Sequence, residues 1–313
     1  MTPERRYFAR IQFRNRILEA NGQRYQDLFI DVMTKRCNGF RPIKPHGTFG
    51  DEGNDGHISN CGRYYQVYAP ENPKENIINA INKAEKDFKR LKEKWSETAL
   101  IEEYLFVFND KFQGAYPKIE HTLAKIKRDN GLKVCEPFLA KDLVNEFMNL
   151  NEDDMIAVLG GVIPRTEYLQ DIDYAILTEI LQYIMDNSES LTINIKLQSP
   201  DFDKKIQFNC ISKSVDSLLR TGSFQQGTIE NYFVKNSNFT RADIRDRLAA
   251  IYDKVKNEIM KFKINDIERG DHVFFVILDD IVQNKKRAVQ DAAIALMAFF
   301  FETCDIFEEP PDE

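Results

Sequence analysis

The sequence predicts a two-domain protein: an α/β domain with a mixed sheet flanked by helices, followed by a mainly α-helical domain. Up to about residue 150, short apolar runs bounded by turn residues alternate with long amphipathic segments, as in a sheet covered by helices. Beyond residue 165 the apolar residues follow mostly the helical period. We place the domains at residues 1–155 and 165–313, because Gly160, Gly161 and Pro164 interrupt the pattern between them.

Two amphipathic helices are expected before the first strand. Residues 4–20 place Phe8, Ile11 and Leu18 at helical spacing among arginines. Residues 23–37 form the second helix, and the Asn-Gly pair that follows marks its end.

Five short extended runs are expected between the second helix and residue 140. They lie at residues 40–45, 55–59, 63–70, 103–110 and 132–140, and the helices between and after them at 74–95, 116–131 and 141–150. The run "EYLFVFND" at 103–110 is nearly continuously apolar, as expected of a buried central strand. Three consecutive strands and a crossover helix to a buried strand predict a mixed sheet with helices on both faces.

The second domain is expected to consist of helices with one hairpin. The helices are predicted at residues 171–187, 212–222, 227–236, 240–263, 271–283 and 287–307. The hairpin is expected at residues 191–211, because apolar and polar residues alternate on both sides of "SPDFD". The last helix is nearly uniformly apolar from Ala292 to Phe301, so we expect it in a core or an interface.

Charge and composition limit the classes of function. The net charge is −7, yet the first 50 residues hold ten Lys/Arg and four Asp/Glu, so a basic start precedes an acidic remainder. That remainder argues against a protein that coats DNA with its whole surface. The arginines of residues 5–16 and the four cations of the helix at 116–131 either bind phosphates or only solvate a helix. Charge alone leaves both interpretations open.

Cysteine usage argues for reduced thiols, and histidine usage argues against a zinc site. The five cysteines are far apart with no CxxC pair, and no two of the four histidines are spaced i, i+4. A disulfide framework and a structural zinc site are therefore not expected. No apolar run is long enough to cross a bilayer, and the charged N-terminus has no signal-peptide core. We expect a cytoplasmic protein.

The stretch "FGDEGNDGHISNCGRYYQVYAP", residues 49–70, joins an acidic, glycine-rich turn to a tyrosine-rich strand. If residues 53–58 and 64–68 form a hairpin, Asp55 and Gln66 come to one end of the sheet. A carboxylate, an amide oxygen and a backbone carbonyl are oxygen ligands that suit Mg²⁺. The remaining positions would hold water and a phosphate oxygen, and the bound water would become a nucleophile.

This stretch resembles the Mrr-type branch of the PD-(D/E)XK nuclease superfamily, in which a G-D-x-G-x-D-G turn precedes Q-x-K. Here "GDEGNDG" and then "YYQVY" carry the resemblance, and the helix "GQRYQDLFIDVM" is similar to the one before that core. "YYQVYAPE", "NKAEKDF" and "FVFND" resemble the N-terminal domains of bacterial ABC-three-component defence systems, including the Lamassu effector subunit. "MAFFFETCDIFEEP" resembles the end of their partner-binding domain.

The resemblance implies a restriction-endonuclease-like fold for the first domain and a partner-binding, regulatory role for the second. It implies that Asp55 is the metal-binding aspartate, that Gln66 is the second ligand, and that Val67 lends its backbone carbonyl. The metal would be Mg²⁺ or Mn²⁺. Asp51 and Glu52 are expected to be solvated turn residues.

The chain departs from the family pattern in two places. The usual lysine of Q-x-K is Tyr68, whose phenol is a proton donor rather than a cation near neutral pH. Some members of the superfamily carry the lysine on the following helix, which makes Lys83 the candidate ahead of Lys86. The helix glutamate of the Mrr-type pattern is replaced by Gln26.

The expected function is that of a metal-dependent endodeoxyribonuclease, the effector of a Lamassu-type antiphage system. The resemblance implies double-stranded DNA as substrate, regulation by an SMC-like ABC ATPase and a small third subunit, and self-association on activation. The alternative is a catalytically inactive nuclease fold that binds DNA or assembles a complex, which the missing Q-x-K lysine favours. A pure adaptor is a third reading.

Overall fold

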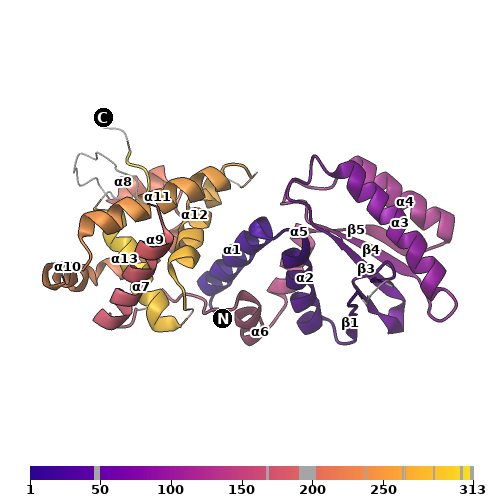
Figure 1. Cartoon of the computed structure of the whole chain (residues 1–313), viewed down its shortest axis with the longest axis horizontal. Coiled ribbons are helices and arrows are strands. Elements are labelled where there is room, and N and C mark those ends of the chain that lie inside the picture. Colours follow the sequence, from indigo (N-terminus) through magenta and orange to yellow (C-terminus); the bar gives the residue numbers. More distant parts are fainter. Residues whose placement is uncertain are drawn as a thin grey trace. The chain divides into compact units, whose positions relative to one another are not determined.

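The computed structural model divides into two compact units, residues 16–158 and residues 1–15 with 159–313 (Figure 1). It describes residues 1–45, 50–166, 169–189, 202–236, 238–262, 264, 266–284, 286–303 and 306–310. The division differs from the predicted one at the N-terminus. An apolar helix face indicates that residues 4–20 must be covered, but periodicity does not say by which domain.

The first unit is built on a five-stranded mixed sheet with the order β1-β2-β3-β4-β5. The strands are β1 (Phe40–Pro42), β2 (Gly56–Ile58), β3 (Arg63–Tyr68), β4 (Glu103–Phe108) and β5 (Val134–Leu139). The pairs β1/β2 and β2/β3 are antiparallel, whereas β3, β4 and β5 run parallel. A mixed sheet with flanking helices and a helical remainder is thus confirmed.

Helices cover both faces of this sheet (Figure 1). They are α2 (Gly22–Arg36), α3 (Ile77–Trp95), α4 (Pro117–Asn130) and α5 (Ala140–Met148), and α6 (Glu152–Leu159) follows α5 along the chain. On one face Phe88 and Leu123, from α3 and α4, join Tyr64 and Phe106 in a buried cluster. On the other face Tyr65 packs on Phe29 of α2. Neighbouring residues of β3 therefore point to opposite layers, as the alternation of side chains along a strand requires.

The turn that follows β4 is hydrogen-bonded to the segment that ends at Ala20. Asn109 donates to the carbonyls of Ile17 (2.9 Å) and Ala20 (3.0 Å), and the fully buried ammonium of Lys111 donates to Ala20 (2.9 Å). These groups satisfy carbonyls that the end of α1 (Pro3–Glu19) leaves unpaired, and a cation there suits the helix dipole. The "FND" motif followed by lysine thus has a structural role.

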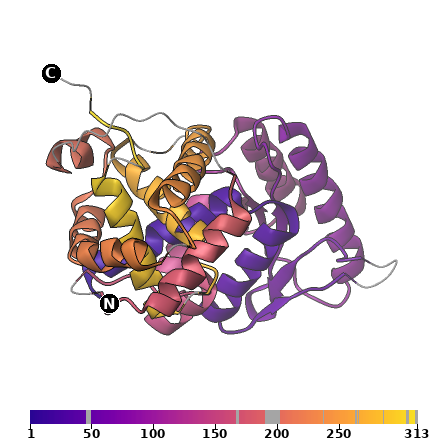
Figure 2. The ribbon, with the colours of Figure 1, turned by 60° about the vertical axis from the view of Figure 1, so that its left-hand side comes forward.

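The second unit is helical. Its helices are α7 (Tyr174–Asn187), α8 (Phe202–Phe208), α9 (Lys213–Ser223), α10 (Gln226–Lys235), α11 (Arg241–Ile259), α12 (Asp266–Ile281) and α13 (Arg287–Glu302). Helix α13 is buried along most of its length and contacts α7, α9, α10 and α12, so it is the core helix (Figure 2). At Gly222 an added Cβ would lie 2.8 Å from Ala298 Cβ, so glycine permits this close contact of α9 with α13.

The predicted hairpin at residues 191–211 is wrong over its second half, since residues 202–208 form α8. Residues 190–201 lie outside the described residues. Phe202 and Ile206 are four positions apart, a spacing that fits a helix as well as a strand. Packing selects the helix: the Phe202 ring lies 5.1 Å from that of Phe301, and Lys205 donates to the Phe301 carbonyl at 2.8 Å.

The first part of α1 belongs to this helical unit. Phe8 is fully buried with its ring 5.4 Å from that of Phe275. The Tyr7 hydroxyl donates to the buried carboxylate of Asp271 at 2.5 Å, and Arg14 pairs with Glu268 at 2.5 Å. At least one arginine of the basic N-terminus is therefore used in an internal ion pair.

Candidate active site

The acidic turn is fixed by close packing against α3. Gly53 has a φ of +87°, and a Cβ added there would lie 2.2 Å from the carbonyl oxygen of Asp87 and 2.7 Å from the Leu91 nitrogen. Only glycine fits this contact. The Gly53 nitrogen also donates to the Asp51 side chain at 3.0 Å. The turn is thereby held on the helix, and it delivers Asp55 to the start of β2.

Asp55 lies at the centre of a converging set of hydrogen bonds. Its Oδ2 accepts from Gln66 Nε2 and from the backbone nitrogen of Val67, both at 2.7 Å. Its Oδ1 accepts from Gln26 Nε2 at 2.6 Å. Asp55 is 3% exposed, and burial raises its pKa to about 6 against the opposing effect of the Val67 hydrogen bond.

Gln66 carries an unused oxygen acceptor. It is 1% exposed, and its Oε1 has no hydrogen-bond partner among the residues that the structure describes. The N–H and C=O of one strand residue point to the same side, so the Val67 carbonyl faces the side on which its N–H meets Asp55. One carboxylate, one amide oxygen and one carbonyl can therefore be presented at this end of β3.

Lys83 brings a cation to the same place. Its Nζ lies 2.7 Å from Asp87 Oδ2, one turn further along α3. Its charge lowers the pKa of Asp55 and also that of Tyr68, so the ammonium lies close enough to act on both. Burial is the larger effect on Tyr68 and raises its pKa, which keeps the phenol protonated. The Tyr68 ring stacks on Phe106 and Phe108.

The structure thus brings together the five predicted site residues. They are Asp55, Gln66, Val67, Tyr68 and Lys83. Gln26, which replaces the helix glutamate, contacts Asp55, whereas its neighbour Asp27 is exposed and accepts from Gln23. Glu52 is half-buried in the turn with a φ of +51°.

Two polar residues at the site were not singled out from the sequence. Asp87 is 9% exposed and holds Lys83; the i, i+4 spacing of the two is the signal that could have found it. Asn54 is fully buried, and neither of its side-chain polar atoms has a hydrogen-bond partner within the described part of the chain. No sequence signal separates this asparagine from an ordinary turn residue.

The donor set at Asp55 suits a hard divalent cation. Within the described residues no three His, Cys, Asp or Glu side chains form a metal-binding group. A cation here would instead use Asp55, the Val67 carbonyl and the orphan Gln66 Oε1, which are oxygen donors of the kind that Mg²⁺ takes together with water. The residues present therefore fit the metal.

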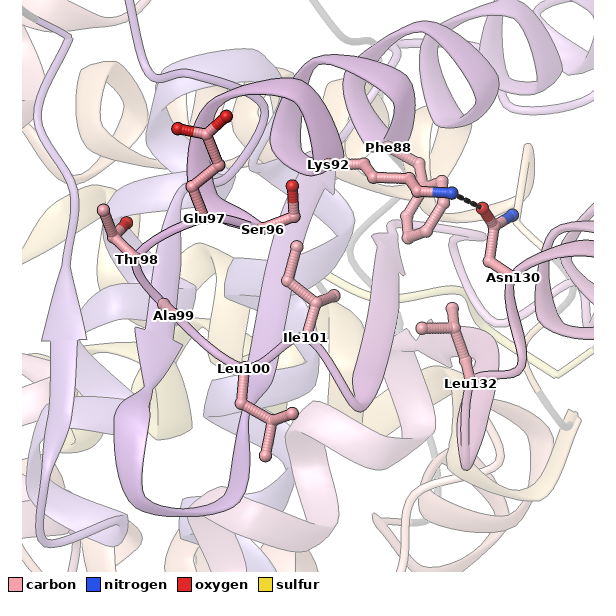
Figure 3. A pocket seen from close by; sticks show the side chains of 10 residues that line it. All are labelled: Phe88, Lys92, Ser96, Glu97, Thr98, Ala99, Leu100, Ile101, Asn130 and Leu132. Atoms are coloured by element: carbon pink, nitrogen blue, oxygen red, sulfur yellow. Dashed lines mark hydrogen bonds between the residues drawn. The ribbon is translucent and has the colours of Figure 1, made fainter.

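A pocket lies elsewhere on this unit, at the ends of α3 and α4 that precede β4 and β5 (Figure 3). Its volume is about 460 Å³, and its lining combines Phe88, Leu100, Ile101 and Leu132 with a few polar groups. Lys92 is hydrogen-bonded to Asn130 at 2.8 Å within it (Figure 3). Its lining holds a single carboxylate, that of Glu97, and no histidine, so this pocket has fewer groups that could act as acid, base or metal ligand than the Asp55 cluster.

Comparison with known proteins gives a match in the helical part. Residues 175–308 match the model of C-terminal domain 10 of the ABC-three component (ABC-3C) systems. The match supports membership of such a system. It spans the described helices from α7 to α13 and does not extend to the sheet. Neither a curated protein nor a solved structure matched the chain.

ABC-three-component systems have partner subunits such as an ABC ATPase. No helix among the described residues is long and apolar enough to cross a membrane.

Proposed function

We propose that the first unit is a restriction-endonuclease-like nuclease that hydrolyses DNA phosphodiesters with Mg²⁺ or Mn²⁺. One observation carries the proposal: a buried aspartate, an amide with an unpaired oxygen, and a lysine ammonium meet at the end of β3. These are the groups that metal-assisted phosphodiester hydrolysis needs. The likeness to the PD-(D/E)XK pattern at residues 50–68 supports the same reaction.

Each residue has a defined task in this proposal. Asp55, Gln66 and the Val67 carbonyl hold the metal, which activates a water and polarises the phosphate when bound. Lys83 places a positive charge beside the phosphate and offsets the charge that develops on it. The protonated Tyr68 hydroxyl donates a proton towards the oxygen that leaves. Asp87 keeps the Lys83 ammonium in position through their 2.7 Å ion pair.

Plasmid cleavage tests the reaction. The purified chain with Mg²⁺ should nick or cut a supercoiled plasmid, and EDTA should stop it. The Asp55→Ala/Gln66→Ala double variant should lose at least about 100-fold of that activity, because both metal-binding side chains are gone. Lys213→Gln, an exposed change in the helical unit, is the matched control and should cut like the wild type. Retained cutting by the double variant would sink the site assignment.

The proposed biological role is that of the effector of a Lamassu-type antiphage system. The match of residues 175–308 to an ABC-three-component C-terminal domain supports it. An SMC-like ABC ATPase and a small third subunit would restrain the nuclease through the helical unit, and release would allow the nuclease units to associate. Co-expression tests this: the three full-length subunits should co-purify, and a chain that purifies without the other two would contradict the role.

A catalytically inactive fold is the second candidate, and Tyr68 in the place of the usual lysine favours it. The two candidates differ in metal binding. A working site should raise the melting temperature in the presence of Mg²⁺ or Mn²⁺, because a ligand that binds the folded state stabilises it. An inactive module should show no such shift.

A further inference from the structure

The two helices on one face of the sheet carry a concentration of positive charge. Helix α3 has six Lys/Arg and three Asp/Glu, and α4 has four Lys/Arg and two Asp/Glu. The chain as a whole has a net charge of −7. The α3–α4 layer, residues 77–95 and 117–130, is therefore a basic region on an acidic protein.

The positive charge of α3 and α4 lies mainly on their solvent-facing side. Helices α3 and α4 contact each other and lie side by side over the sheet (Figures 1 and 2), and Lys92 of one bonds Asn130 of the other at 2.8 Å. Most of their apolar residues are buried against the sheet, with Phe88, Leu91 and Leu123 at most 5% exposed, whereas Ile78 at the start of α3 is exposed. The lysines are left on the opposite, solvent-facing side.

Half of these ten cations are lysines whose charge no neighbour neutralises. The side-chain ammonium groups of five exposed lysines have no ion pair or hydrogen bond to any described residue: Lys86, Lys94, Lys118, Lys125 and Lys127. Lys89 is paired only loosely, with Glu93 at 3.9 Å and its own side chain 79% exposed. Lysines used to solvate a helix are commonly interspersed with acids, so a layer of uncompensated cations indicates an anionic partner.

The basic layer is continuous with the candidate active site. Lys83 and Lys86 lie on neighbouring turns of α3, and Arg90 and Lys94 continue the same stripe. From Lys83 to Lys94 the stripe extends roughly 16 Å at 1.5 Å per residue, about five phosphate steps of a duplex strand. Its first member acts on Asp55, and the Asp55 turn packs on the same helix at Asp87. An anionic chain held along α3 would lead to that site.

We propose that the α3–α4 layer binds the phosphate backbone of duplex DNA. This rests on the proposed nuclease function for the choice of DNA. The extent of the stripe suits a repeating anion rather than a single phosphate group. A lipid surface fits less well, because most apolar residues of both helices are buried and the exposed Ile78 alone gives little apolar area for insertion, so the surface offers mainly charge.

Equilibrium binding of the full-length chain to a short fluorescent duplex tests the proposal. The measurement is made in EDTA, so that cleavage does not interfere. The triple variant Lys118→Gln/Lys125→Gln/Lys127→Gln lies on α4, away from Asp55 and Lys83. It should bind at least tenfold more weakly at low salt, and its plot of log K against log salt should flatten by about 0.9 per lost contact.

The matched control removes three exposed lysines of the helical unit: Lys213, Lys235 and Lys261, each changed to Gln. Its affinity should stay within about twofold of the wild type, since no phosphate contact is removed. Equal weakening of both variants would mean that net charge alone governs binding, and this overturns the proposal. So does wild-type affinity of the α4 variant, or a wild-type chain that binds no duplex. Binding of anionic vesicles in place of duplex would also overturn it.

Parallel plasmid assays with Mg²⁺ separate this proposal from the nuclease proposal. If the α4 variant binds and cuts like the wild type, the surface is wrong and the nuclease stands. If the wild type binds duplex through these lysines but never cuts it, the surface stands and the nuclease is wrong.

Discussion

Gln66 Nε2 lies 2.7 Å from Oδ2 of Asp55, and the other amide atom, Oε1, is buried without a partner among the described residues. This geometry suits the metal-free state, in which the amide must donate to the carboxylate. A half-turn of the amide would bring Oε1 to the carboxylate instead. Two oxygen acceptors are stable at that distance only with a cation between them, so the pair can respond to a metal.

Gln66→Glu tests this pairing through stability. Without metal, the new carboxylate would face Asp55 at about the present 2.7 Å, and like charges in a buried site cost roughly 2 kcal/mol or raise a pKa. We expect a lower melting temperature in EDTA and a larger recovery with Mg²⁺ than in the wild type. Gln66→Met, which has no charge to relieve, is the control. An equal response of Gln66→Glu and the wild type to Mg²⁺ would contradict the assignment.

Gly53→Ala should destabilise the first unit by about 2–4 kcal/mol. The added Cβ would overlap the Asp87 carbonyl, and alanine is strained at a φ of +87°. Cleavage should fall with it, because the turn that carries Asp55 is displaced from α3. Gly227→Ala on α10 is the matched change, since its Cβ meets nothing within 4 Å and alanine favours the helix. Urea denaturation of both variants is the measurement, and equal effects would refute the packing argument.

His272 should make the helical unit sensitive to acid. It is fully buried, Nδ1 contacts Asn15 Oδ1, and burial lowers its pKa from 6.5 to about 3. The unfolded chain therefore binds a proton between these values that the folded chain does not, so stability falls as the pH drops below 6.5. The loss should reach roughly 2 kcal/mol at pH 5, at about 1.4 kcal/mol per unit.

Thermal unfolding at pH 7 and pH 5 measures this effect. His272→Gln should remove that part of the loss, whereas His121→Gln, a change on the exposed face of α4, should leave it in place. An acid sensitivity that is the same in all three proteins would assign it to other groups.

The Asp55–Gln66 contact could be predicted because strand register is local. Gly56 pairs with Tyr65, so one further step along the hairpin sets Asp55 opposite Gln66. The position of α3 could be predicted from its helical period, and so, in part, could the side that it buries. Ala80, Ala84 and Leu91 form the buried stripe, and Lys83 lies closer to that stripe than Lys86 does.

Contacts between distant segments could not be predicted from the sequence. The apolar face of α1 is evident, but only the packing of Phe8 on Phe275 assigns it to the helical unit. The sequence predicts a strand where α8 forms, because seven residues with Phe202 and Ile206 four positions apart satisfy either period. Its burial against Phe301 decides the outcome.

Substitutions at residues 83 and 68 test whether Lys83 takes the role of the lysine that is missing from Q-x-K. If Lys83 supplies the cation, Lys83→Ala should lower the rate of plasmid cleavage by about 100-fold, and Lys83→Arg by less. Placing lysine at its usual position, Tyr68→Lys in the Lys83→Ala background, should then restore part of the rate, because both side chains act on the Asp55 end of the sheet. Lys213→Ala, an exposed change in the helical unit, is the control and should cut like the wild type. Wild-type rates in Lys83→Ala would remove Lys83 from the site.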